Sequence, residues 1–208
     1  MHRPTKRILA TSLFAITWIA AVAFGLGVLF QYENTPGRVG AVSPEWPETQ
    51  IERATDRPTL VMLAHPHCPC TAASVGELAQ IMARLQGRVA AYVLFVKPKG
   101  AGRDWEDTNL RRDAEAIPGV KVVLDPDGVE ARRFGAETSG HTLLFGTDGR
   151  LLFSGGITAS RGHAGDNTGE GAIIALLNHQ TPARAQTLVF GCALADSIKR
   201  ESKALCLK

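Results

Sequence analysis

Two cysteines and two histidines gather in the short segment 65–70, which carries the clearest chemistry in the sequence. Cys68 and Cys70 are separated by one proline, and His65 and His67 come just before them. A thiolate attacks disulfides and binds soft metal ions, and its reactivity depends on how far the pKa of the thiol is lowered. Neighbouring imidazoles can supply positive charge or hydrogen bonds. The segment therefore points to thiol chemistry or to metal binding.

This cysteine segment joins a predicted strand to a predicted helix. Residues 59–64 form a continuous apolar run, and residues 71–85 repeat apolar side chains with the helical period. Ser74 and Glu77 have the spacing of a capping box, so we expect the helix to begin at Thr71 or at Ser74. The free N–H groups and the positive end of a helix stabilise a thiolate, and they lower the cysteine pKa from its usual value of about 8.5.

The N-terminal part of the chain is basic and then uncharged. Arg3, Lys6 and Arg7 precede an apolar segment from Ile8 to Phe30 that holds no charged residue. A helix of this length can span a bilayer, which takes about 20 residues. A cleaved signal peptide is the alternative, although its apolar region is usually shorter. Basic residues before a span place residues 1–7 in the cytoplasm and everything that follows outside, in the periplasm if the cell has two membranes.

The rest of the chain predicts one α/β domain between a stalk and a tail. Residues 31–58 are rich in Pro, Glu and Thr and are expected to form an extracytoplasmic stalk that lies on the domain or leads to it. Residues 59–180 are expected to form the domain, and residues 181–208 a C-terminal helical extension. Further strands are expected at 89–96, 120–124, 142–145 and 151–154, and helices at 104–116, capped by Asp104, and at 129–134 and 171–178.

Charge and cysteine content narrow the functional classes. The net charge is +3 with acidic and basic residues interspersed, so nothing indicates a nucleic-acid interface. Four cysteines, an even number, are compatible with an oxidising compartment. The two not yet mentioned are Cys192 and Cys206. They can pair with each other if the helix between them breaks, or Cys192 can act as a remote resolving thiol.

Two segments in the second half of the domain, 124–136 and 142–153, closely resemble membrane-anchored bacterial thioredoxin-like proteins of the TlpA/ResA type. With the cysteine segment and the glycine-rich loop, they look most similar to the small anchored group often labelled RedB. The resemblance covers about residues 59–178. It implies a thioredoxin-like fold, in which helices flank a central mixed sheet, here preceded by one N-terminal transmembrane helix.

The resemblance also implies roles for the cysteines. Thioredoxins usually carry two residues between the cysteines, and here Thr71 occupies the position of the second cysteine. Cys68 keeps the position of the exposed nucleophile. Cys70 would be the resolving cysteine, and it lies one residue closer to Cys68 than the second cysteine usually does. A disulfide between them would close a small ring, and strained disulfides are more oxidising.

A second part of the expected site comes just before the predicted hairpin. In thioredoxins a cis-proline at this place faces the cysteines, and here Gly140 or His141 takes that position. Copper chaperones of the Sco type share the extended fold and bind copper with two cysteines and one histidine before a hairpin strand. Their resemblance implies Cys68, Cys70 and His141 as an alternative copper site, and thiolates with imidazole suit Cu(I). Otherwise His141 caps a loop by hydrogen bonding.

The glycine-rich loop at 155–169 is expected to return to the cysteine end of the domain. Within it Arg161 could hold an anionic group, and His163 could serve as a base or a ligand. The alternative is a solvated loop without a role.

These observations predict a membrane-anchored, extracytoplasmic thiol–disulfide oxidoreductase that needs no cofactor and acts on a disulfide- or dithiol-bearing protein. Cys68 and Cys70 form its expected redox pair. The alternative is a Sco-like copper chaperone or sensor, and a thiol peroxidase is less favoured because the peroxide-positioning pattern is missing. The supporting residues are expected to be His65, His67, Thr71, Gly140, His141, Arg161 and His163.

Overall fold

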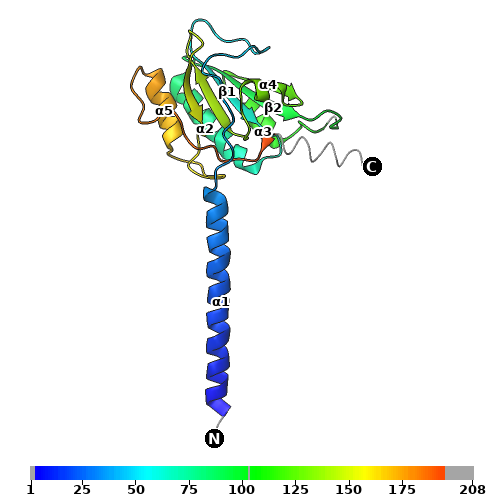
Figure 1. Cartoon of the computed structure of the whole chain (residues 1–208), viewed down its shortest axis with the longest axis vertical. Coiled ribbons are helices and arrows are strands. Elements are labelled where there is room, and N and C mark those ends of the chain that lie inside the picture. Colours follow the sequence, from blue (N-terminus) through cyan, green and yellow to red (C-terminus); the bar gives the residue numbers. More distant parts are fainter. Residues whose placement is uncertain (1–2, 103, 195–208) are drawn as a thin grey trace. The chain divides into compact units, whose positions relative to one another are not determined.

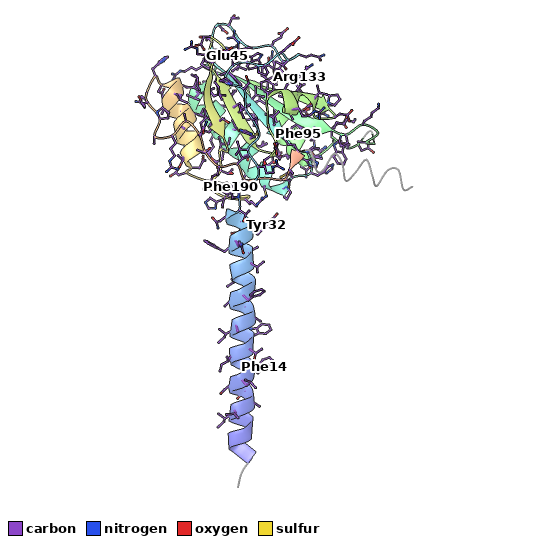
Figure 2. All side chains as sticks on the ribbon, in the orientation of Figure 1. Phe14, Tyr32, Glu45, Phe95, Arg133 and Phe190 are labelled. Atoms are coloured by element: carbon purple, nitrogen blue, oxygen red, sulfur yellow. The ribbon has the colours of Figure 1, made fainter. Side chains whose placement is uncertain are left out.

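The computed structural model describes residues 3–102 and 104–194. The chain divides into two units, Met1–Thr35 and Pro36–Lys208. The first unit is a single helix, α1 (Arg3–Asn34), drawn in blue in Figure 1. Within α1, Ile8–Asn34 is long and apolar enough to cross a membrane, and a signal sequence would satisfy the same criteria. Figure 2 shows its side chains, including the labelled Phe14, projecting outward along the helix. The apolar helix expected from Ile8 to Phe30 is confirmed and continues to Asn34.

A five-stranded mixed sheet forms the centre of the second unit. Its strands lie in the order β3-β2-β1-β4-β5. The strands β1, β2 and β3 are parallel, whereas β4 runs antiparallel to β1 and β5 runs antiparallel to β4. The α/β order that ends in an antiparallel pair is therefore confirmed. The strand bounds are β1 Thr59–Ala64, β2 Ala90–Lys97, β3 Val120–Pro126, β4 His141–Phe145 and β5 Leu151–Gly155.

Helices cover both faces of this sheet (Figure 1). The first apolar cluster joins alternate strand residues such as Met62 and Phe95 to α2, α3 and α5. The second cluster joins the strand residues of opposite orientation, such as Leu63, to α4. The helix bounds are α2 Pro69–Leu85, α3 Asn109–Glu115, α4 Val129–Arg133 and α5 Thr168–Leu177. Phe95, labelled in Figure 2, is fully buried in the first cluster.

The segment expected to be a stalk lies on the domain. From Pro36 onward it belongs to the second unit. The Trp46 ring packs edge-on against Phe134 and Phe145, with centroid distances of 5.3 and 5.0 Å. Ile51 is buried in the second apolar cluster. Aromatic contacts of this kind fix the segment to the sheet face that α4 covers.

Two expected helix starts were wrong. The helix α2 begins at Pro69, not at Thr71 or Ser74, because proline suits the first helical position and Cys68 already serves as N-cap. The helix α3 begins at Asn109 instead of Asp104, because the Thr108 side chain accepts a hydrogen bond from Arg111 N and caps the helix there. Of the expected C-terminal extension, residues 181–193 form no helix, and nearly all of the helix expected from Cys192 to Leu205, with Cys206, lies outside the described residues.

Candidate functional site

Cys68 lies where β1 gives way to α2, as the sequence predicted, and the structure makes it the N-cap residue of the helix. Its backbone N–H donates to His65 O at 3.1 Å, and its carbonyl oxygen accepts from Thr71 N at 3.1 Å. The expectation that Cys68 is exposed was wrong, since only 1% of the residue is accessible. Cys68 belongs to neither apolar cluster, however, and its sulfur is in contact with backbone N–H and polar side-chain groups of Cys192 and Thr71.

A segment far along the chain covers Cys68. Residues 185–189 first run beside β5, where Thr187 N donates to Ser154 O and Gly156 N donates to Leu188 O. Phe190, which is labelled in Figure 2, follows directly after these residues. The chain then pairs with the loop before β4 through two hydrogen bonds of 2.8 Å, from Ser139 N to Cys192 O and from Leu194 N to Glu137 O. We call residues 190–194 the covering segment.

Cys192, in the covering segment, makes direct contact with the buried sulfur. Its backbone N–H points at Cys68 Sγ, at a distance of 3.4 Å. Its thiol also hydrogen-bonds that sulfur. Cys192 is half-buried, and Cys68, Cys70 and Cys192 are all free thiols. Among the described cysteines, all three therefore meet at one place.

These contacts lower the pKa of the Cys68 thiol to about 4. The hydrogen bond from the Cys192 thiol is the largest cause. Burial opposes it, and the Thr71 hydroxyl and the backbone N–H groups of Cys192 and Thr71 add further hydrogen bonds to the thiolate. Hydrogen bonds to the charged form of a group favour that form. Cys68 is therefore a thiolate at neutral pH.

A chain of hydrogen bonds leads to this thiolate from the loop before β4. The Ser139 hydroxyl accepts from His65 N at 2.8 Å and lies 2.6 Å from the Thr71 hydroxyl. If Ser139 donates to Thr71, the Thr71 proton is free to point at Cys68. Thr71 lies three residues after the N-cap, on the same side of the first helical turn as Cys68. The position that a second cysteine takes in the usual motif thus supplies a hydrogen-bond donor.

Cys70 and Arg161 complete the group around the sulfur. Burial and the negative charge of Cys68 raise the pKa of Cys70, whereas Arg161 lowers it. The Arg161 guanidinium also donates to Gly191 O at 2.6 Å, so it holds the covering segment. Arg161 was predicted from the glycine-rich loop, and the structure places it beside the thiols.

The rings of His65 and His67 pack edge-on against Trp105. Burial lowers the pKa of His65, the Cys68 charge raises it less, and His67 lowers it further. His65 is therefore neutral at pH 7, and the expectation that it adds positive charge was wrong. Its Nδ1 accepts from His67 N at 3.2 Å. The exposed His67 ring lies 4.4 Å from the ring of Trp105, which also packs against His65.

Gly140 directly precedes β4, and His141 is the first residue of that strand. Gly140 has φ +87°, and a Cβ there would lie 2.9 Å from Ser74 Oγ, so glycine suits this close approach to α2. His141 is fully buried, its Nε2 lies 2.9 Å from Ser154 Oγ, and burial lowers its pKa to about 4. By strand alternation it shares the sheet face of Leu143, opposite the face that α2 covers.

The copper alternative gains no support from this arrangement. Among residues 3–102 and 104–194, no three His, Cys, Asp or Glu side chains form a group that could hold a metal ion. His141 bonds Ser154 across the β4–β5 pair. Copper binding by Cys68, Cys70 and His141 stays a prediction.

The glycine-rich loop is fastened to α2 by a buried carboxylate. Glu77 Oε1 accepts from Gly165 N at 2.7 Å, so Glu77 serves the loop instead of a capping box with Ser74. This anchor helps to fix the loop that presents Arg161. His163, by contrast, lies on the loop with an exposed side chain. The structure brings together Cys68, Cys70, Thr71 and Arg161 of the predicted residues.

Two residues of the site, Ser139 and Trp105, were not assigned a role there by the sequence. For Cys192 the sequence left two alternatives open, pairing with Cys206 or acting as a remote resolving thiol, since nothing local shows that residues 190–194 pair with residues 137–139. Ser139 carries no signal apart from its place before a strand. Trp105 follows a basic loop, and its Nε1 donates to Val96 O at 3.2 Å, which directs the ring to the histidines.

Comparisons with known proteins address the fold. No family model and no curated protein matches the chain. Among solved structures, an uncharacterized conserved protein from Geobacillus kaustophilus is similar with a TM-score of 0.57 and 19% identity, covering 78% of this chain and 94% of that chain. A hypothetical protein from Sinorhizobium meliloti gives 0.55 and 18%, with 78% and 97% covered.

A third match is a putative thiol:disulfide interchange protein DsbE from Chlorobium tepidum, with a TM-score of 0.43 and 16% identity, covering 69% of this chain and 98% of that chain. At such identities a similarity speaks for the fold alone. With the order of the five strands and the helices on both faces of the sheet, the chain has a thioredoxin-like fold that carries its cysteine segment between β1 and α2.

Proposed function

We propose that the protein is a thiol–disulfide oxidoreductase in which Cys68 is the nucleophile. One observation carries the proposal: the Cys68 sulfur lies at the N-cap of α2 and accepts hydrogen bonds from Cys192 and Thr71, which lower its pKa to about 4. The thiolate is the reactive form of cysteine in disulfide exchange. The neighbouring thiols supply the second sulfur that such a cycle needs.

The reaction follows from this arrangement. The Cys68 thiolate attacks a sulfur of a partner disulfide, and the other partner sulfur leaves as a thiolate. A second thiol of this chain then attacks Cys68 in the mixed disulfide, and the second partner thiol is released. Cys70 is the candidate that the Cys-Pro-Cys spacing provides. In the reduced state Cys68 is covered, so the partner must displace part of residues 190–194 to reach it.

The low pKa of Cys68 also favours one direction of electron flow. A stabilised thiolate is a good leaving group, and it makes the reduced protein more stable relative to its disulfide form. We therefore expect the disulfide form to oxidise dithiols of a partner protein, as strongly oxidising exchange proteins do.

The N-terminal unit suggests where the reaction takes place. α1 contains an apolar stretch that can span a membrane, and three basic residues precede that stretch. We propose a single-pass anchor in the cytoplasmic membrane with the thioredoxin-like domain on the periplasmic or extracellular side. Disulfide chemistry persists in such compartments.

A redox titration tests the proposed function. The full-length protein in detergent is equilibrated with glutathione buffers of graded poise, and its free thiols are then alkylated and counted by mass. We expect Cys68 to pass reversibly from thiol to disulfide, and the transition to be lost in Cys68→Ser. A Cys68 that stays reduced at every poise would contradict the proposal.

A further inference from the structure

The covering segment brings a second cysteine to Cys68 from the far end of the domain. Two sets of backbone hydrogen bonds hold its course, first to β5 and then to residues 137–139. In the second set the Cys192 carbonyl accepts from Ser139 N, while the Cys192 N–H points at Cys68 Sγ. The backbone on both sides of the Cys192 side chain is therefore fixed, and the thiol stays beside the buried sulfur.

The neighbouring glycine makes this approach possible. A Cβ at residue 191 would lie 2.0 Å from Ser139 O, a distance that no side chain could adopt. Arg161 donates to the carbonyl of the same glycine. Glycine and arginine together thus bring the covering segment close to the loop before β4, and they place Cys192 next to Cys68.

Cys70 is placed less well to react with Cys68. Cys70 also hydrogen-bonds Cys68, but it reaches that sulfur from only two residues along the same turn, where the N-cap Cys68 has extended backbone. Thr71 takes the side of the turn that faces Cys68. A bond between Cys68 and Cys70 would also close a small ring across a proline. Cys192 lies on a separate segment, so neither the short spacing nor the small ring limits a bond between Cys192 and Cys68.

We propose that Cys192 is the resolving thiol and that the oxidised protein carries a Cys68–Cys192 disulfide. This inference rests on the proposed function and assigns its second sulfur. The Cys192 thiol attacks Cys68 Sγ of the mixed disulfide, the Cys68–partner S–S bond breaks, and the Cys68–Cys192 bond forms. The partner sulfur leaves with the electron pair and takes up the proton that Cys192 loses. Cys70 stays a thiol throughout.

The pKa of Cys192 depends on the charge of Cys68, so Cys192 becomes reactive only after the mixed disulfide has formed. The hydrogen bond to the Cys68 thiolate, followed by burial, raises the pKa of Cys192, so Cys192 stays protonated as a donor in the reduced state. In the mixed disulfide Cys68 carries no charge, and this cause disappears. Arg161, which lowers the pKa of Cys192, remains. Cys192 therefore loses its proton more readily once the partner is attached.

Disulfide mapping of the full-length protein in detergent tests this proposal. Trypsin leaves Cys68 and Cys70 together in the peptide 54–84, Cys192 in 185–199 and Cys206 in 204–208. After oxidation with oxidised glutathione and alkylation of the free thiols, we expect a cross-link between peptides 54–84 and 185–199. It should persist in Cys70→Ser and in the control Cys206→Ser, and be lost in Cys68→Ser and in Cys192→Ser.

The trapped intermediate provides a second readout. With the resolving thiol removed, Cys192→Ser should accumulate the Cys68–glutathione mixed disulfide at least tenfold over the wild type, whereas Cys70→Ser should not. An internal disulfide within peptide 54–84, or a link between peptides 185–199 and 204–208, in the wild type would overturn the assignment of Cys192 and leave the proposed function standing. A Cys68 that never oxidises would instead remove the proposed function itself.

Discussion

The backbone N–H of Cys192 lies 3.4 Å from Cys68 Sγ, although 124 residues separate the two cysteines in sequence. The contact places an uncharged donor on a sulfur that burial alone would keep protonated. Burial raises the pKa of Cys68, and the hydrogen bonds from Cys192 and Thr71 outweigh it. The reactivity of Cys68 is therefore a property of the folded domain rather than of the Cys-Pro-Cys segment alone.

Stability of the reduced protein should depend on pH through Cys68. Its pKa is about 4 in the folded state and about 8.5 when unfolded, so the unfolded chain binds more protons between these values. The stabilisation is complete above the unfolded pKa and is lost as the pH falls toward 4, by about 1.4 kcal/mol per pH unit. We expect the thermal midpoint of the full-length protein to fall as pH decreases from 8.5 to 7.

The control for this prediction is Cys68→Ala, in which the same pH interval should change the midpoint much less. Buried His65 and His141, whose pKa values are lowered, also lose stability on acidification, but only below about 6.5, the usual histidine pKa. The interval above pH 7 therefore excludes the histidines. Cys70 and Cys192, whose pKa values are raised in the folded protein, reduce stability as the pH rises toward 8.5, so the contribution of Cys68 is clearest between pH 7 and 8. An equal pH dependence in the wild type and in Cys68→Ala would show that the Cys68 pKa is not lowered.

Thr71 should tune the Cys68 thiolate through its hydroxyl. Thr71→Val keeps the shape of this buried side chain and removes the hydrogen bond to the sulfur. A hydrogen bond to a charged group contributes about 1.5–3 kcal/mol, which corresponds to a rise of about one to two units in the pKa of Cys68. The pKa of Cys68 is measured by titration of the thiolate absorbance, with the wild type and the Thr71 variants all compared in a Cys70→Ala background. Thr71→Ser, which keeps the hydroxyl, should titrate near the wild type.

Much of the fold follows from local patterns, whereas the covering of Cys68 does not. The apolar runs of β1 and β2, the helical period after Cys70 and the turn at Asp148-Gly149 indicate the α/β order directly. The start of α2 was misplaced because Cys68 caps the helix without the side-chain oxygen that caps usually supply. The position of Cys192 depends on backbone pairing between residues 137–139 and 192–194, which leaves no periodicity in the sequence.

Arg161 should hold Cys192 in place, because its guanidinium donates to Gly191 O. In Arg161→Gln we expect the Cys192 thiol of the reduced protein to be alkylated up to about tenfold faster, because the loss of a charge-assisted hydrogen bond of about 1.5 kcal/mol exposes it, an effect that the higher pKa of Cys192 without the arginine opposes. The rate is followed by mass on peptide 185–199. The matched control is Arg150→Gln, which removes an exposed arginine paired with Asp148. Equal alkylation rates of Cys192 in the two variants would show that Arg161 does not hold the covering segment in place.

The N-terminal helix should retain the protein in the membrane. We expect the wild type to stay in the membrane pellet after an alkaline carbonate wash and to retain the apolar segment 8–34. Ile19→Arg with Val22→Arg should reduce this fraction, since each arginine near a span centre costs about 2.5–3.5 kcal/mol for insertion. Leucine at both positions is the control. A soluble wild-type protein that lacks the apolar segment would instead identify a cleaved signal peptide.

Gly191→Ala should displace the covering segment from Cys68. The new Cβ would meet Ser139 O, a backbone atom that cannot move without disturbing the loop before β4, so the covering segment itself must shift. We expect a loss of about 1–3 kcal/mol in the free energy of unfolding, as for other overpacked sites. Because the Cys192 thiol and N–H are then displaced from Cys68 Sγ, the pKa of Cys68 should also rise. Gly171→Ala is the matched control, since nothing lies within 4 Å of a Cβ on this exposed face of α5, and alanine there favours the helix. A Gly191→Ala protein that is destabilised but keeps the wild-type titration of Cys68 would show that the covering segment does not control the thiolate.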